Sequence, residues 1–194
     1  MHCNRKEELS IWAKRLERSI GIIKNIRNWT TVFEDYLGFK KQKYFYLMRN
    51  GARIQVRGGT TDKAIIMETW IDRAYFQGGF DILENDTIID IGAQIGSFSV
   101  LASLLANNGR IFSYEPVPAN YDLLTTNIQV NNIKNILAVN KAVTGTIEER
   151  YIYLSDDDVG GHSFDSDRVE QLREQGHQFS KKICNYSAMP SKSL

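Results

Sequence analysis

The sequence predicts an α/β fold built around a parallel sheet, and three observations support this. A β-branched run, Thr87–Ile91, has the composition of a buried strand, and a turn with glycines at 92 and 96 follows it. A second apolar strand, Ile111–Tyr114, ends in Glu115. A strand, a glycine-bearing turn, a helix and a strand that ends in a carboxylate form the unit that binds the adenosine half of a cofactor.

Residues 6–27 are predicted to form the first helix, because their apolar side chains recur at helical spacing. Basic residues outnumber acidic ones along this helix, so its apolar stripe has two interpretations. The stripe packs on the domain or caps its functional site, or it forms a basic amphipathic face that contacts a membrane surface. The residues of the stripe are Leu9, Trp12, Leu16, Ile20 and Ile23.

A hairpin and a second helix are expected next. Strands around Tyr44–Met48 and Ile54–Arg57 flank Asn50-Gly51, a dipeptide typical of tight hairpin turns. A helix from Asp62 to about Tyr75 then presents its apolar side to the core. The expected core residues of this helix are Ile65, Ile66, Trp70 and Ile71.

The glycine turn sits between a strand and a helix. The strand Thr87–Ile91 is almost continuously apolar, which predicts a parallel strand covered on both faces. Gly92 allows a positive φ and has no Cβ, so a ligand can approach the turn closely. Gly96 is expected to let the following helix, Ser97 to about Asn107, pack close to the strand. The predicted buried positions of that helix are Phe98, Leu101 and Leu105.

Glu115 lies where folds of this kind place a ribose-binding acid. An ionised carboxylate accepts hydrogen bonds from both ribose hydroxyls, and such charge-assisted bonds are strong. The alternative is that Glu115 is a surface acid and that Asp90 only caps the turn. After Pro116 and Pro118 we expect a helix from about Ala119 to Val130, and a third strand from Ile136 to about Asn140.

The spacing of the glycines distinguishes two cofactors. A nicotinamide fingerprint that starts at Gly92 needs glycine at positions 94 and 97, where this chain has Gln94 and Ser97. The two missing glycines argue against an NAD-dependent oxidoreductase. The pattern Asp90-x-Gly92-x-x-x-Gly96 instead resembles motif I of the methyltransferases that use S-adenosyl-L-methionine (SAM).

The wider sequence resembles the FkbM-type methyltransferases over roughly residues 45 to 194. The matching segments are Arg57–Asp62, Glu68–Trp70, Tyr75, Asp90–Ser99, Tyr114–Asn120, Leu124, Asn127 and Asn131-Asn132. The resemblance implies a Rossmann-like class I SAM-dependent methyltransferase fold and O-methylation of a hydroxyl on a sugar, polyketide or other small metabolite. The implied cofactor-binding residues are Asp90, Gly92, Ala93, Gln94, Gly96, Ser97, Phe98, Glu115, Pro116, Asn140, Lys141 and Ala142.

Two further interpretations, for residues 140–142 and for residues 161–163, have plain alternatives. Asn140, Lys141 and Ala142 are candidate adenine contacts by the resemblance, but a simple turn at the end of the strand explains them equally well. In the loop with Gly161, His162 and Ser163, the imidazole of His162 is a candidate general base, and a solvated loop is the alternative. No residue is assigned as the catalytic base.

The family continues with a further core strand that carries an Asp-x-x-Lys-x-Asp type segment, which this sequence lacks. We therefore expect residues 1–80 to form an N-terminal helical and hairpin segment, and residues 81–194 to form the N-terminal half of the SAM-binding domain, with the C-terminal half of the sheet missing. A non-catalytic truncated fragment, or a partner subunit of a split methyltransferase, is the alternative function. An exposed helix is expected over residues 165–175, and an antiparallel strand outside the core over residues 182–186.

The composition fits a globular domain, with 42% hydrophobic and 24% charged residues. A net charge of +1 gives no basic excess for nucleic-acid binding. With only Cys3 and Cys184, no disulfide framework is expected, which favours the cytoplasm. The three histidines show no metal-ligand spacing, and no apolar run is long enough to span a bilayer. The expected partners are a small-molecule acceptor and either a second copy or a complementing chain.

Overall fold

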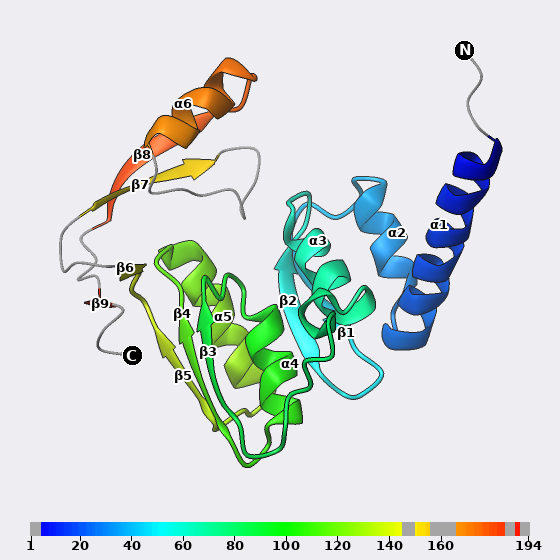
Figure 1. Cartoon of the computed structure of the whole chain (residues 1–194), viewed down its shortest axis with the longest axis horizontal. Coiled ribbons are helices and arrows are strands. Elements are labelled where there is room, and N and C mark those ends of the chain that lie inside the picture. Colours follow the sequence, from blue (N-terminus) through cyan, green and yellow to red (C-terminus); the bar gives the residue numbers. More distant parts are fainter. Residues whose placement is uncertain (1–4, 145–149, 156–165, 185–188, 191–194) are drawn as a thin grey trace.

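A three-stranded parallel sheet forms the centre of the computed structural model, which describes residues 5–144, 150–155, 166–184 and 189–190 (Figure 1). The strand order is β3-β4-β5, and each crossover passes through one helix. This arrangement confirms the predicted α/β fold and its strand–turn–helix–strand unit. The elements are β3 (Thr87–Ile91), α4 (Ser97–Leu105), β4 (Arg110–Tyr114), α5 (Pro118–Val130) and β5 (Ile136–Val139).

Only one face of this sheet is covered within the described part of the chain. The register aligns Ile89 with Phe112 and Phe112 with Leu137, so these three side chains share a face. Ile89 and Leu137 are 44% and 57% exposed, and Ile91 on the same face is 60% exposed. The prediction that the strand is covered on both faces is therefore wrong, because α4 and α5 pack only on the opposite face.

The buried face of α4 also differs from the prediction. Phe98 and Leu101 are only partly buried, and Leu105 is exposed. Small side chains take the buried positions instead, since close packing of this helix against β4 and α5 leaves little room. The buried residues of α4 are Ser97, Ser99, Val100, Ala102 and Ser103.

The first helix, α1 (Arg5–Asn25), is followed by a short helix, α2 (Thr30–Tyr36), that the sequence did not predict. Within the described residues α1 packs through Ile22, while Trp12, Leu16, Ile20 and Ile23 of the predicted stripe are exposed. Trp12 and Leu16 are 64% and 63% exposed. The helix does pack on the domain, against η1 (Met67–Ile71) and through the ion pair of Arg18 with Asp72 at 2.9 Å, but not through these apolar side chains. It lies at one end of the molecule (Figure 1).

The predicted hairpin is present as β1 (Lys43–Leu47) and β2 (Arg53–Arg57), paired antiparallel. It docks on α5 through two asparagines one helical turn apart. Asn127 exchanges hydrogen bonds with the backbone N–H and C=O of Gln55, at 2.6 and 3.1 Å, and Asn131 does the same with Arg53, at 2.8 and 2.7 Å. These contacts fix the hairpin against the sheet layer.

The predicted helix over residues 62–75 is broken into three short pieces. One turn of α-helix is followed directly by a π-helical turn, in which each backbone hydrogen bond spans one residue more than in an α-helix. Arg73, with φ of 49°, then ends the run in the left-handed region. Ile66, Met67 and Trp70 are buried, so most of the expected core face is kept. The pieces are α3 (Asp62–Ile66), η1 (Met67–Ile71) and η2 (Ala74–Phe76).

The remaining described elements stand apart from the sheet, at the end opposite α1 (Figure 1). The predicted helix and antiparallel strand are confirmed as α6 (Ser166–Glu174) and β8 (Phe179–Cys184), although β8 begins earlier than expected. The partner strand of β8 is β7 (Arg150–Ser155), and two short strands, β6 (Val143–Thr144) and β9 (Met189–Pro190), pair parallel. Over the described residues, no helix has the length and apolar character needed to cross a bilayer.

Candidate cofactor site at the carboxyl edge of the sheet

The glycine turn after β3 has the backbone that the sequence implies. Gly92 and Gly96 have φ of 78° and 81°, and Gln94 between them has φ of 49°. The backbone N–H groups of Gly92 and Ala93 both donate to the carbonyl of Tyr114, at 2.9 and 3.0 Å, which ties the turn to the end of β4. A Cβ on Gly92 would meet no atom within 4 Å, so the space above this residue is open.

Gly96 has a different role from Gly92. A Cβ at position 96 would lie 2.5 Å from Cδ1 of Leu124 and 3.4 Å from its Cα. The close approach that Gly96 allows is therefore between the turn and α5, rather than between α4 and the strand as predicted. The missing side chain at position 96 lets the fully buried Leu124 pack directly beneath the turn.

Glu115 lies under the turn and is only 3% exposed, which excludes the surface-acid interpretation. Its Oε2 accepts a hydrogen bond from the backbone N–H of Gln94 at 2.8 Å, and its Oε1 accepts one from Val117 at 2.8 Å. Burial raises the pKa of the Glu115 carboxyl, and these backbone bonds oppose that rise. Each carboxylate oxygen has two acceptor directions, and the bond from Gln94 takes one of those of Oε2.

A polar chain connects Glu115 to the hairpin. The guanidinium of Arg57 forms an ion pair with the fully buried Asp62 at 2.8 Å, and it also donates to Oδ1 of Asn120 at 2.8 Å. This bond leaves the amide NH2 of Asn120 facing Oε1 of Glu115, at 3.5 Å. The hairpin and α5 therefore hold the carboxylate from the side opposite to the glycine turn.

The hydrogen bond of the Asp90 side chain goes to α4 and not to the backbone of the turn. In β3 the Asp90 side chain faces α4, where its Oδ2 accepts a hydrogen bond of 2.5 Å from the hydroxyl of Ser99. Ser99 in turn accepts one of 2.8 Å from Ser113 on β4. Burial raises the pKa of the Asp90 carboxyl, and the bond from Ser99 opposes the rise. Asp90 thus joins the strands to α4 beneath the turn.

Two cavities flank Gly92, and both include it in their lining. The first, of about 230 Å³, is lined by Tyr114, Pro116, Lys141 and Ala142, on the β5 side. The second, of about 330 Å³, is lined by Gln94 from the turn, Thr61 before α3, Glu68 on η1 and Tyr75 on η2. Both lie along the carboxyl ends of the strands, where ligands of open α/β sheets bind.

The remaining predicted residues do not line either cavity. The side chain of Asn140 donates one N–H to the backbone carbonyl of Glu115 at 2.7 Å. Ala93 and Ser97 are buried under the turn, and the ring of Phe98 packs on Tyr75 with centroids 4.6 Å apart. These three residues shape the turn and do not line either cavity. Gly161, His162 and Ser163 lie outside the described residues.

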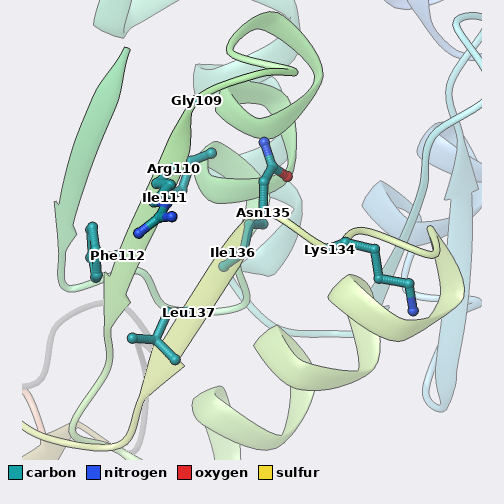
Figure 2. Close-up of a pocket in the computed structure, with 8 residues that line it drawn as sticks. All are labelled: Gly109, Arg110, Ile111, Phe112, Lys134, Asn135, Ile136 and Leu137. Carbon is teal, nitrogen blue, oxygen red and sulfur yellow. The ribbon is translucent and has the colours of Figure 1, made fainter. Parts of the chain in front are cut away.

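A third cavity, of about 450 Å³, lies at the opposite end of the strands (Figure 2). Gly109 and Arg110 line it at the beginning of β4, and Lys134 and Asn135 line it just before β5. It is therefore at the amino edge of the sheet, remote from the glycine turn. Its position argues against a role in cofactor binding, despite its size.

Sequence reasoning gave no role to Glu68 or Tyr75, although both lie in segments that carry the family resemblance. Both precede the strand–turn–helix–strand unit, so no local pattern of that unit includes them. The break between α3 and η1 places Glu68 at the cavity, and no sequence pattern predicted this π-helical turn. In the described residues no group of three or more histidine, cysteine, aspartate or glutamate side chains is arranged to hold a metal ion.

The parallel sheet, the open glycine turn and the buried acid define a class I SAM-dependent methyltransferase. The model of the TRM5/TYW2 methyltransferase domain matches residues 79–177, which is more than half of the chain. The chain belongs to this family, and its cofactor is SAM.

Parts of the chain are similar to known proteins. The 31-O-demethyl-FK506 methyltransferase FkbM of Streptomyces tacrolimicus is 28% identical over 78 residues, which are 40% of this chain and 30% of that protein. This match confirms the FkbM resemblance, and the chain spans less than a third of that relative. Among solved structures, TYW2 of P. horikoshii (16% identity, 62% of this chain and 49% of that one, TM-score 0.44) and FkbM of Methylobacillus flagellatus (16% identity, 38% and 21%, TM-score 0.33) are similar.

Proposed function

We propose that this chain binds SAM along the carboxyl edge of β3, β4 and β5 and supports transfer of a methyl group to a hydroxyl oxygen. The acceptor class is a small metabolite, such as a sugar or a polyketide. One observation carries the proposal: the open Gly92 lines two cavities, and Gln94 in the same turn holds the buried carboxylate of Glu115. The name of the FkbM relative specifies an O-demethyl acceptor, which supports oxygen as the methylated atom.

In this proposal the adenine ring occupies the cavity of Pro116, Lys141 and Ala142. The ribose lies over Glu115, whose Oε2 accepts a hydrogen bond from one hydroxyl. Asp90, Ala93, Ser97 and Phe98 act from beneath, because they fix the backbone of the turn without touching the ligand. Gln94 contributes through its N–H, which aligns the carboxylate of Glu115.

SAM supplies a methyl group that is already activated on a sulfonium, so the chain has to orient the reactants and exclude water. Holding two reactants in line accounts for roughly 7–11 kcal/mol of barrier lowering in favourable cases. Gly92 and Glu115 bind and position, and neither takes part in proton transfer in this proposal. A base that accepts the acceptor's hydroxyl proton would add about 10²–10⁴-fold.

The test is a cofactor titration by isothermal calorimetry with SAM and, separately, with NADH. We expect the wild-type chain to bind SAM and not NADH. Glu115→Ala should weaken SAM binding by more than tenfold, which is about 1.4 kcal/mol or more, because the ribose loses a charge-assisted acceptor. Glu174→Ala, an exposed glutamate on α6, is the matched control and should bind as the wild type does.

Two results would contradict the proposal. Binding of NADH in preference to SAM would overturn the cofactor assignment, and unchanged SAM affinity in Glu115→Ala would overturn the ribose assignment. A circular dichroism melt of each variant checks that the fold is retained. Methyl transfer from radiolabelled SAM to panels of sugars and polyketide alcohols then tests the acceptor class.

A further inference from the structure

We infer that the exposed side of α1 docks on the surface of a lipid bilayer that contains anionic lipids. The contact is made by an apolar line of four side chains, called here the α1 stripe, and by the basic residues beside it. The α1 stripe consists of Trp12, Leu16, Ile20 and Ile23. Since no residue of the cofactor site takes part, this surface is independent of the proposed function.

The four residues of the α1 stripe lie on one side of the helix. Their spacings of four, four and three residues place them within an arc of about 80°, because each residue of an α-helix advances by about 100°. All four are exposed. Apolar residues that are scattered singly over a surface are ordinary, whereas a contiguous line of large ones marks an interaction site.

The packing of α1 directs this line away from the domain. The helix approaches η1 closely at Gly21, where a Cβ would lie 2.7 Å from Cγ2 of Ile71. On the same side of the helix, Arg18 forms its ion pair with Asp72. Gly21 is about 140° around the helix from the middle of the α1 stripe. The contact that holds α1 in place therefore leaves the stripe pointing outward, at one end of the molecule (Figure 1).

Basic residues border the α1 stripe. From Trp12 to Trp29 the chain has five basic residues and one acidic residue, Glu17, so this segment has a net charge of +4 where the whole chain has +1. Arg15 and Lys24 fall on opposite borders of the stripe, about 60° and about 40° beyond its edges. In the described part of the chain no ion pair involves either of them, so both cations are available to anionic headgroups.

This combination of features fits a bilayer surface. A helix of this kind lies in the plane of the interface, with its tryptophan and aliphatic side chains at the boundary of headgroups and acyl chains. Tryptophan is enriched at that boundary. Basic side chains beside the apolar face extend to the headgroups, and each one near the surface is attracted by anionic lipids. The guanidinium of Arg15 already lies over the ring of Trp12, 5.3 Å from its centroid, so cation and ring are presented together.

A second copy of this chain fits the α1 stripe less well. Helices that pair through an apolar seam place opposite charges along its borders. Here Arg15 and Lys24 put a cation on each border, so two copies would bring like charges together. Anionic headgroups complement the same charges.

Exposed apolar side chains also continue beyond α1. Nine of the 17 large apolar side chains that are exposed in the described residues lie between positions 12 and 39. Trp29 and Phe33 of the α2 region are among them, with ring centroids 5.9 Å apart. The helices α1 and α2 are neighbours at the same end of the molecule (Figure 1). The exposed apolar surface is therefore concentrated where the membrane contact is placed.

The experiment measures cosedimentation of the full chain with vesicles of phosphatidylcholine, either alone or with about 30% phosphatidylserine. Leu16→Ser tests the apolar contact. Its matched control is Leu83→Ser, because Leu83 lies outside this surface and the two leucines are 63% and 64% exposed. Light scattering of each variant without vesicles measures its oligomeric state, and a circular dichroism melt checks that the fold is retained.

A pair of double variants tests the charges. Arg15→Gln with Lys24→Gln removes the two cations at the borders of the stripe. Arg110→Gln with Lys134→Gln removes two exposed cations at the amino edge of the sheet instead (Figure 2). Both double variants change the net charge of the chain equally, so a difference between them reports the position of the charges.

We expect the wild-type chain to bind the vesicles with phosphatidylserine, and to bind them less in about 0.5 M salt, which screens the charges. Leu16→Ser should lower the partition coefficient by about fivefold to tenfold, since it removes most of a buried leucine side chain. Arg15→Gln with Lys24→Gln should lower it by about tenfold. Both controls should bind as the wild type does.

Quenching of tryptophan fluorescence by lipids brominated along the acyl chain locates the contact. Trp12→Phe keeps an apolar ring in the α1 stripe, so it should bind the vesicles as the wild type does but lose most of the quenching. Bound Trp12→Phe with undiminished quenching would place another part of the chain in the bilayer and overturn the inference.

Three further results would overturn the inference. A wild-type chain that does not bind the anionic vesicles has no such surface, and a Leu16→Ser variant that turns a dimer into a monomer would then assign the stripe to a second copy. Binding by Leu16→Ser equal to that of Leu83→Ser would exclude the stripe from the contact. Equal losses in the two double variants would show that net charge alone determines binding. In every case a chain that still binds SAM leaves the proposed function standing.

Discussion

Asp90 and Glu115 show how one site uses two buried carboxyls differently. Glu115 accepts hydrogen bonds from the backbone of the turn and of the segment before α5, so its position is fixed from two sides. Asp90 accepts a bond from a serine hydroxyl inside the layer between the sheet and α4. In the proposed function the first binds the ribose, whereas the second joins the sheet to α4.

The burial of Asp90 makes a prediction for stability against pH. Because burial raises the pKa of its carboxyl above the ordinary 3.8, the folded protein binds this proton more tightly than the unfolded chain does. The free energy of unfolding therefore falls as pH rises from the unfolded pKa through the folded pKa. Asp90→Asn removes this titration, and its amide oxygen can still accept from Ser99. We expect the stability of Asp90→Asn relative to the wild type to increase as pH rises.

Urea unfolding of both proteins between about pH 3.5 and about pH 7 measures this difference, in the range where aspartates titrate. Asp81→Asn, at an exposed position just before β3, is the control and should track the wild type. A stability difference between Asp90→Asn and the wild type that stays constant with pH would contradict the prediction.

At the scale of the element, the two glycines of the turn are expected to affect ligand binding and stability differently. Both glycines have a positive φ, so alanine at either position is strained by about 1 kcal/mol. Gly96→Ala also forces a Cβ against Leu124, which should cost about 1–3 kcal/mol more. Gly92→Ala should lose little stability beyond the strain, and should weaken SAM binding more than Gly96→Ala does, because Gly92 lines both cavities.

Chemical denaturation and SAM titration of both variants measure the two effects side by side. Gly79→Ala is a control for strain alone, since Gly79 also has a positive φ and open space around it. Equal losses of stability in all three variants would show that contact with Leu124 does not constrain position 96.

The elements also show which features the sequence can predict. The strand, the glycine turn and the following strand were predictable because glycine spacing and apolar runs are local signals. The packing of α4 through Ser99, Val100 and Ala102 was not predictable in this way. Helical periodicity is identified from large apolar side chains, whereas close helix packing favours small ones. The π-helical turn at Met67–Ile71 was also missed, since its composition does not differ from that of an α-helix.

The site was predictable to the extent that one continuous segment carries it. The Gly92 turn and Glu115 lie within 24 residues of each other in the sequence, and the structure brings them into direct contact. Glu68 and Tyr75 come from the segment before the sheet, and their approach to Gly92 depends on the tertiary packing of Trp70 against Ser97. A local sequence pattern cannot predict that tertiary contact.

At the scale of the whole molecule, the open face of the sheet makes a further prediction. Leu137 is 57% exposed in β5, while Ile111 on the covered face is fully buried. Leu137→Thr should therefore change the free energy of unfolding by less than about 0.5 kcal/mol. Ile111→Thr should cost about 2–4 kcal/mol, since it buries a hydroxyl and leaves a void.

Binding of the dye 1-anilinonaphthalene-8-sulfonate gives a second measurement of the same face. Exposed apolar side chains bind this dye, so Leu137→Thr should lower its fluorescence in the folded protein. A loss of stability in Leu137→Thr that approaches the loss in Ile111→Thr would show that this face is covered in solution.

The asparagines that dock the hairpin have a consequence for aggregation. Two-stranded ribbons expose an unpaired backbone edge on each side, and such edges recruit further strands from other chains. One helical turn of four residues advances about 6 Å, close to the repeat of about 6.8 Å between alternate residues of a strand. The amides of Asn127 and Asn131 therefore occupy the backbone groups of β2 as a neighbouring strand would, and Asn28 does the same for Phe45 and Leu47 of β1. Three side chains thus occupy backbone groups on both edges of the ribbon with which a strand from a second chain would otherwise pair.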